Sequence, residues 1–154
     1  MNKIVECYNI PVVVSTHPRT KRLFELVTNT LIDPRIRFLK PFVFFYFVKL
    51  QMDAKCTLSD SGTISEESAI LNFPAISLRQ SIERPEAQDA GTIILSGFDH
   101  DIVLNSIDVV IKEQKIGGYS KIAEEYTITN TSWRVLKLIM GNTGLSNKWW
   151  GIEV

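Results

Sequence analysis

Residues 58–67 read Leu58-Ser59-Asp60-Ser61-Gly62-Thr63-Ile64-Ser65-Glu66-Glu67, and the rest of the chain is organised around this stretch. Its pattern predicts the end of a buried strand, a tight Ser61-Gly62 turn and the first turns of a helix. Such a junction binds anions, because the first N–H groups of a helix lack internal partners and the helix dipole adds positive potential. Ser61 can add a hydroxyl, and Gly62 lets the backbone approach a phosphate.

The two glutamates of this stretch have different expected roles. Glu67 follows Thr63 by four residues and shares its helix face, whereas Glu66 points elsewhere and is interpreted as a structural or solvated acid. One turn into the helix, the Glu67 carboxylate is far enough from a phosphate to accept hydrogen bonds from ribose hydroxyls instead. The stretch therefore suggests a nucleotide site. The alternative is a plain helix start with a serine cap and solvated acids.

Composition limits the classes of function. A chain of 154 residues is expected to form one domain with a sizeable core. Its 17 basic and 17 acidic residues cancel, which does not favour a general nucleic-acid or membrane-surface binder. Cys7 and Cys56 form no metal-spaced cluster and are too few for a disulfide scaffold, so a reduced, cytoplasmic protein without metal or other cofactor is expected. The most apolar run, 41–48, is too short for a membrane span of about 20 residues.

Short apolar runs alternate with segments of helical spacing along the chain. The expected strands are 12–16, 36–39, 56–59, 74–79 and 92–97, and the first of them is expected to be buried on both faces. The expected helices are 20–30, 41–52, 63–72, one capped by Asp99, and one starting at 130–132. Residues 80–89 are interpreted as a polar loop, and the aromatic side chains of 42–47 as core. This alternation predicts an α/β fold with an open, mostly parallel sheet.

In sheets of this kind, ligands bind at the carboxyl ends of the strands. His17 follows the first expected strand, Ser61 and Gly62 follow the third, and Arg79 and Arg84 follow the fourth. This convergence of polar residues at one edge favours the nucleotide site over the plain helix start.

Several segments, in order and at a characteristic spacing, also resemble a known family. They are Phe38-Leu39-Lys40-Pro41, Phe47-Val48-Lys49-Leu50, 59–67, Phe73-Pro74-Ala75, Glu83-Arg84-Pro85-Glu86 and Ala90-Gly91-Thr92. Together they resemble the non-hydrolysing UDP-N-acetylglucosamine 2-epimerases over residues 10–140. Thr63 and Ser65 resemble the branch that serves capsule and O-antigen synthesis.

The resemblance implies a fold and the part of that fold to which this chain corresponds. The family has two Rossmann-like lobes of the glycosyltransferase-B type, and residues 1–154 correspond to a single α/β domain, the C-terminal, UDP-binding lobe without its first strand. The N-terminal lobe and a histidine-arginine motif of the family have no counterpart, so no catalytic residue is assigned. Residues 141–154 are expected to be a divergent tail.

The resemblance also implies roles for individual residues. The implied UDP ligands are Phe42 and Phe47 for uracil through their backbone, Ser61, Gly62 and Thr63 for the diphosphate, Glu67 for the ribose, and Arg84 for the nucleotide sugar. His17 matches a segment near a second, regulatory nucleotide-sugar site. Two alternatives stay open: Arg84 could form only a local ion pair with Glu83 or Glu86, and His17 could be a structural loop residue.

Two classes of function remain at this point. In the first, the chain is the UDP-sugar-binding half of a 2-epimerase and is inactive alone. In the second, it is a noncatalytic remnant or a nucleotide-binding or interaction module. A glycosyltransferase lobe shares the fold but is disfavoured by the motifs. Because a missing lobe exposes apolar surface, a separate chain carrying that lobe, or self-association, is expected.

Overall fold

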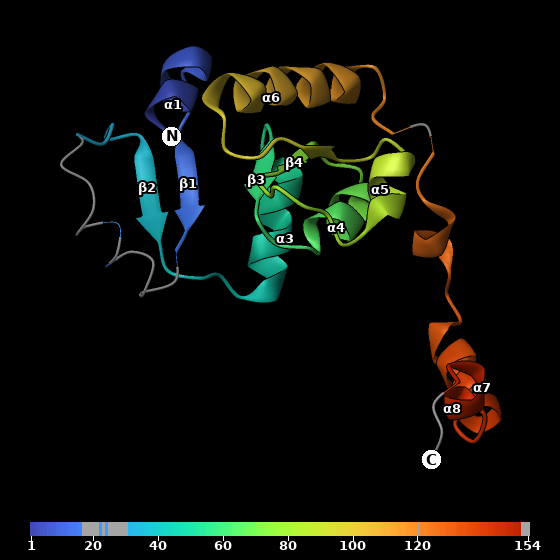
Figure 1. Cartoon of the computed structure of the whole chain (residues 1–154). Coiled ribbons are helices and arrows are strands. Elements are labelled where there is room, and N and C mark those ends of the chain that lie inside the picture. Colours follow the sequence, from blue (N-terminus) through green and yellow to red (C-terminus); the bar gives the residue numbers. More distant parts are fainter. Residues whose placement is uncertain (17–21, 23, 25–30, 120, 152–154) are drawn as a thin grey trace.

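The computed structural model describes residues 1–16, 22, 24, 31–119 and 121–151 (Figure 1). The helices are α1 (Asn2–Tyr8), α3 (Phe44–Asp53), α4 (Ile64–Leu71), α5 (Pro85–Asp89), α6 (His100–Lys115), α7 (Thr131–Asn142) and α8 (Ser146–Trp149), with a 3-10 helix η1 (Glu124–Thr127). The strands are β1 (Val12–Ser15), β2 (Ile36–Leu39), β3 (Thr57–Ser59), β4 (Ala75–Ser77) and β5 (Ile94–Leu95).

The strands form two parallel sheets. One has the order β1-β2 and the other the order β3-β4-β5, and every pairing is parallel. The predicted α/β class and parallel pairing are confirmed. The single open sheet is not seen, because in the described part of the chain no ladder joins β1 to β3, which lie next to each other in Figure 1.

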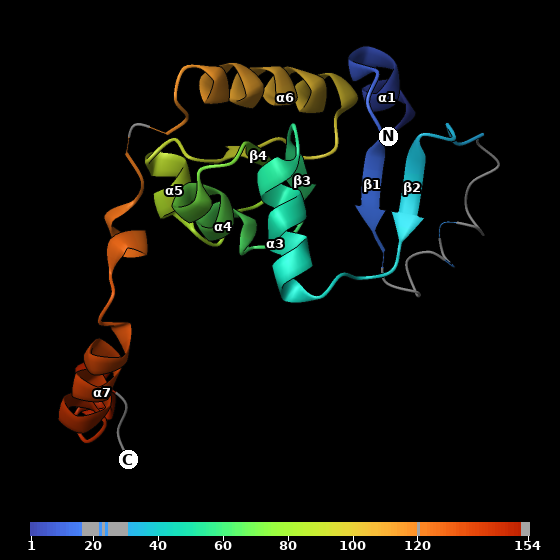
Figure 2. The same cartoon turned by 180° about the vertical axis from the view of Figure 1, so that it is seen from behind.

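The three-stranded sheet lies between two helical layers. Side chains alternate along a strand, so Ala75 and Ile76 in β4 face opposite sides. Ala75 belongs to a cluster that includes Ile64 of α4 and Ala87 of α5, whereas Ile76 packs with Val103, Ile107 and Val110 of α6. Figures 1 and 2 show the same arrangement, with α6 on one side of β4 and α4 and α5 on the other.

Helix α1 connects the two sheets. Ile4 and Tyr8 of α1 pack against the α6 cluster, and Tyr8 donates its hydroxyl hydrogen to Oδ1 of Asp108 at 2.7 Å. Burial, followed by the hydrogen bond to Asp108, raises the pKa of Tyr8. Since β1 follows α1 directly, this contact holds the β1-β2 sheet against the rest of the fold.

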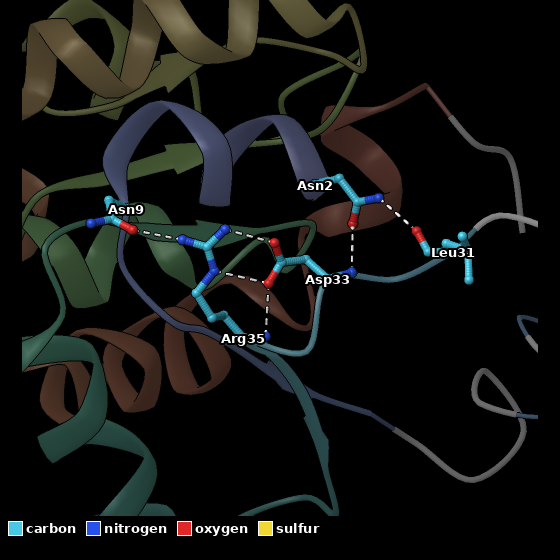
Figure 3. Close-up of polar contacts among 5 residues, drawn as sticks. All are labelled: Asn2, Asn9, Leu31, Asp33 and Arg35. Carbon is cyan, nitrogen blue, oxygen red and sulfur yellow. Dashed lines mark hydrogen bonds and ion pairs between the residues drawn. The ribbon is translucent and has the colours of Figure 1, made fainter.

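A polar cluster fixes the start of β2 to both ends of α1 (Figure 3). Asp33 accepts three hydrogen bonds from Arg35, at 2.9 Å from the backbone N–H, 2.9 Å from Nε and 2.7 Å from Nη2. Nη1 of Arg35 donates to Asn9 at 2.6 Å. At the other end of α1, Asn2 accepts the N–H of Asp33 at 3.2 Å and donates to the Leu31 carbonyl at 2.8 Å. The hydrogen bonds from Arg35 lower the pKa of Asp33 to about 2.

Two expectations about burial are wrong. Strand β1 was expected to be buried on both faces, but Val13 is 47% exposed. The aromatic run was expected to fill the core, but Phe44, Phe45 and Tyr46 are 68%, 83% and 69% exposed. The reason is that Gln51 is the buried residue of α3, whereas among the described residues nothing covers the side chains of Phe44, Phe45 and Tyr46.

Helix boundaries follow local chemistry. Asp99 caps α6 as predicted, because its carboxylate accepts from the N–H groups of Asp101 and Ile102 at 3.0 Å each. Helix α5 was missed within the segment interpreted as a loop; Pro85 begins it, and proline suits the first helical position. The expected helix 20–30 lies outside the described residues except for Arg22 and Phe24, which are helical.

The last two helices stand apart from the sheets in both views (Figures 1 and 2). Helix α7 forms where the sequence predicts it, but it buries none of its residues, and its apolar side, including Leu138 and Ile139, is exposed. The assignment of residues 141–154 as a divergent tail stays a prediction. None of the helices in the described residues is both long and apolar enough to cross a membrane.

Candidate functional site

The turn between β3 and α4 is closed by its own hydroxyl groups. Ser59 Oγ accepts a hydrogen bond from the N–H of Ser61 at 3.1 Å, and Ser61 Oγ accepts one from the N–H of Thr63 at 3.3 Å. The hydroxyl oxygens of Ser61 and Thr63 lie 2.9 Å apart. Both of these residues are exposed, so the turn is held in shape while its hydroxyls remain accessible to a ligand.

The first turn of α4 directs its two glutamates to different partners. Glu66 Oε1 accepts from Arg84 Nε at 2.5 Å, whereas Glu67 Oε2 accepts from Gln51 Nε2 at 2.8 Å. Both side chains are half-buried. The different directions agree with the helical spacing, and of the two interpretations of Glu66 as a structural or a solvated acid, the ion pair with Arg84 favours the structural one.

Two arginines reach over Gly62 from the segment that follows β4. A Cβ atom built on Gly62 would lie 2.7 Å from Nη1 of Arg84 and 3.3 Å from Nη1 of Arg79. Arg79 pairs with Glu83 at 2.7 Å, and this contact lowers the pKa of Glu83. Among the described residues, Arg84 forms its ion pair with Glu66 of α4, 18 positions away, so the alternative of a purely local ion pair is wrong.

These groups surround a small surface pocket at the carboxyl ends of β3 and β4. Its lining includes Ser61, Gly62, Ser65, Ser77, Arg79 and Arg84. Guanidinium groups bind phosphate oxygens in a fork, and a helix N-terminus adds favourable potential. The absence of a side chain on Gly62 leaves the space into which both guanidinium groups project. The pocket therefore has the chemistry of a phosphate or diphosphate site.

The two phenylalanines that are expected to hold the uracil lie before and within α3. Phe42 is half-buried in the connection that precedes α3, and Phe47 is half-buried in its first turns, where its N–H donates to the Val43 carbonyl at 3.0 Å. Neither is among the described residues that line the pocket. Their role in holding uracil stays a prediction.

Groups for acid–base or metal chemistry are few near the pocket. The carboxylate of Glu83, which lines the pocket, and that of Glu66 are both held in ion pairs with arginine. His100 is exposed at the start of α6, and His17 lies outside the described residues, so its regulatory role stays a prediction. Within the described part of the chain, no group of three or more histidine, cysteine, aspartate or glutamate side chains could hold a metal ion.

Three contributors to the site were not assigned from the sequence. Ser65 and Ser77 line the pocket through the spatial approach of α4 and β4, which no local pattern reveals. Gln51 contacts Glu67 from α3, and the only signal was a polar residue within an apolar stretch. Arg79, by contrast, is among the polar residues predicted to converge at the strand ends, and the structure brings it to the same glycine as Arg84.

Comparison with known proteins places this geometry in a family. A family model described as UDP-N-acetylglucosamine 2-epimerase matches residues 1–140. The chain is similar to the UDP-N-acetylglucosamine 2-epimerases of Methanocaldococcus jannaschii, with 31% identity over 116 residues, and of Methanococcus maripaludis, with 33% identity over 118 residues. These matches cover 73% and 75% of this chain but only 32% of each relative, so the chain spans a minor part of their length.

Solved structures agree. A UDP-N-acetylglucosamine 2-epimerase from Rickettsia bellii is 37% identical with a TM-score of 0.80, over 97% of this chain and 42% of that chain. The Methanocaldococcus jannaschii enzyme in complex with UDP-GlcNAc and UDP is 26% identical with a TM-score of 0.67, over 88% of this chain and 38% of that chain. The predicted likeness to one lobe of a glycosyltransferase-B-like fold is thereby confirmed. The chain belongs to the UDP-N-acetylglucosamine 2-epimerase family.

Proposed function

We propose that this chain is the UDP-binding half of a UDP-N-acetylglucosamine 2-epimerase. The observation that carries the proposal is the convergence of Arg79, Arg84 and the N-terminus of α4 on Gly62. The position of Gly62, which has no side chain, is surrounded by two guanidinium groups, two hydroxyls and the positive end of a helix dipole. This arrangement suits a diphosphate better than an uncharged ligand. The relative from Methanocaldococcus jannaschii, solved with UDP-GlcNAc and UDP, supports the choice of ligand.

In this proposal each residue has a defined task. The diphosphate lies on Ser61, Gly62 and Thr63, with Arg84 and Arg79 on its oxygens. The ribose hydroxyls donate to Glu67, which lies one helical turn further along α4. The backbone around Phe42 and Phe47 receives the uracil.

Calorimetry tests the binding site directly. UDP, UMP and uridine are titrated into the full chain, and affinity is expected to fall in that order as phosphates are removed. The variants Glu67→Ala and Arg84→Met are expected to weaken UDP binding, whereas Lys112→Met on the exposed surface of α6 leaves it unchanged. A parent chain that binds uridine as tightly as UDP would contradict the diphosphate site.

The same proposal predicts no epimerisation by the chain alone. General acid–base catalysis needs groups within hydrogen-bond reach of the reacting carbon, and the carboxylates nearest the pocket are paired with arginine. Proton NMR of UDP-N-acetylglucosamine incubated with the chain is expected to show no C2 epimer. Its appearance would refute the claim of inactivity.

A second candidate function is a nucleotide-binding or interaction module that depends on another chain. It is favoured by exposed apolar side chains on two separate helices, Phe44 and Phe45 on α3 and Trp133 on α7. Isolated apolar residues are ordinary on protein surfaces, but contiguous aromatic runs mark interfaces. We propose that a chain carrying the other lobe, or a second copy, covers them. Sedimentation velocity showing a stable monomer over a wide range of concentrations would weaken this candidate.

The cellular setting belongs to the same proposal. Thr63 and Ser65 are the residues that support capsule or O-antigen synthesis over other pathways, and a cytoplasmic location fits the nucleotide-sugar substrate. Deletion of the coding sequence, followed by analysis of surface polysaccharide and complementation in trans, tests the first point. Cell fractionation tests the second.

A further inference from the structure

Gln51 is a polar residue whose side chain is buried. It is the buried residue of α3, with 4% of its surface exposed, and it lies between the exposed Leu50 and Met52. Its Nε2 donates to Glu67 Oε2 at 2.8 Å, while its own Oε1 is buried and accepts no hydrogen bond from any described residue. A buried amide that leaves one atom unpaired is unfavourable compared with a hydrocarbon of similar volume.

The hydrogen bond to Glu67 fixes the orientation of this amide. An ionised carboxylate only accepts hydrogen bonds, so the amide nitrogen must face it, and the opposite orientation would set two oxygens against each other. This hydrogen bond between α3 and α4 thus holds the donor in place. The hydrogen bond from Gln51 involves one carboxylate oxygen, Oε2, and among the described residues the other, Oε1 of the half-buried Glu67, accepts no hydrogen bond.

We propose that Gln51 is a positioning residue that holds Glu67 in the orientation that accepts the hydroxyls of a ribose diol. This proposal rests on the proposed function, because it concerns the same nucleotide site. It assigns to Gln51 the preference for ribonucleotides over nucleotides without ribose hydroxyls. The unfavourable buried amide is retained because it restrains a carboxylate that would otherwise sample several rotamers.

The test compares two ligands on four proteins. UDP and 2′,3′-dideoxy-UDP are titrated calorimetrically into the parent chain, Gln51→Met, Glu67→Gln and the double variant. Gln51→Met preserves volume and removes the donor, and Gln114→Met on α6, which removes an amide donor to the Asn72 carbonyl at 3.0 Å, is the matched control.

The expected result is a loss of binding affinity only for the ligand that carries the ribose diol. Gln51→Met weakens UDP binding about tenfold, which corresponds to about 1.4 kcal/mol, and leaves dideoxy-UDP within about twofold of the parent. In the double variant, the loss does not exceed that of Glu67→Gln alone, because Gln51 acts through Glu67. Gln114→Met binds both ligands like the parent.

The outcomes separate the two proposals. If Gln51→Met weakens both ligands equally, or changes neither, the positioning role is overturned while UDP binding stands. If the parent binds UDP and dideoxy-UDP equally, the ribose subsite at Glu67 and the role of Gln51 fail while the diphosphate site stands. If the parent does not bind UDP, the proposed nucleotide site itself fails.

A measurement on the parent protein covers the case in which Gln51→Met does not fold. The side-chain amide resonances of Gln51 are followed by ¹⁵N-correlated NMR during titration with each ligand. UDP is expected to shift them and dideoxy-UDP to shift them much less, because only UDP contacts the carboxylate. No shift of these resonances at saturating UDP would overturn the positioning role.

Discussion

Replacing Gly62 with alanine separates the proposed site from the stability of the fold. The new Cβ would lie 2.7 Å from Arg84 Nη1, whereas ordinary contacts begin at 3.4 Å, so that guanidinium must retreat by 3.4 − 2.7 = 0.7 Å. The space lost is the space that a diphosphate oxygen would share with the arginines. UDP affinity is therefore expected to fall at least about tenfold, or about 1.4 kcal/mol.

The stability of the same variant is expected to change little. Gly62 does not have a positive φ, so alanine reduces the entropy of the unfolded chain and stabilises by about 0.4–1 kcal/mol. Displacing Arg84 strains its half-exposed ion pair with Glu66, which is worth about 0.2–1 kcal/mol. These contributions nearly cancel, and a net change below about 1 kcal/mol shifts the melting temperature by less than about 4 °C.

The assay combines calorimetry with UDP and thermal unfolding followed by circular dichroism. Gly91→Ala is the control, because Gly91 has a φ of +73° with no atom near its Cβ position, so alanine there strains the backbone and not the site. It is expected to lower the melting temperature and to keep UDP affinity at low temperature. The reasoning is refuted if Gly62→Ala binds UDP as tightly as the parent, or if it loses affinity only because it unfolds.

Three further predictions concern the fold. Because Arg35 lowers the pKa of Asp33 to about 2, below its value in the unfolded chain, the ion pair stabilises the fold fully above pH 5 and loses this effect as the pH falls towards 2. Urea unfolding of Asp33→Asn should thus differ from that of the parent most at pH 7 and least near pH 2; a constant difference would contradict the assignment. Burial raises the pKa of Cys56 to about 12, so Ellman's reagent should modify the exposed Cys7 readily and Cys56 only on unfolding; equal rates for Cys7→Ser and Cys56→Ser variants would contradict this. Tyr8→Phe removes the hydroxyl that donates to Asp108 and to the Leu104 carbonyl, and should lower the free energy of unfolding by about 1 kcal/mol in urea. The loss should be smaller in a background that already carries Asp108→Ala, and an equal loss there would contradict the contact with Asp108.

The parts of the fold that depend on nearest neighbours in sequence are predictable. Strand β1 follows from its β-branched run, and the cap at Asp99 follows from a single carboxylate before a helix. The turn at Gly62 and the separation of Glu66 from Glu67 follow from helical spacing. All of these depend on contacts within a few residues.

The parts that depend on distant contacts are not predictable in the same way. Gln51 and Glu67 are 16 residues apart, and Arg84 and Glu66 are 18 apart, so no periodicity pairs them. Phe44 and Phe45 were placed in the core because their hydrophobicity favours burial, but hydrophobicity does not say whether any other element is present to cover them. Pro85 signals a helix start only if the residues after it are known to pack.

The placement of α1 has a consequence for local opening. No ladder between described residues joins the two sheets. The side chains of Ile4 and Tyr8, which belong to α1, pack against α6 and link β1 and β2 to the rest of the fold. The molecule should therefore open in two cooperative units of different free energy. Amide hydrogen exchange should be faster in β1 and β2 than in β4, and Tyr8→Phe should accelerate exchange in the first pair alone. The free energy needed to separate the two sheets is thus determined by the packing of one helix and not by a continuous sheet.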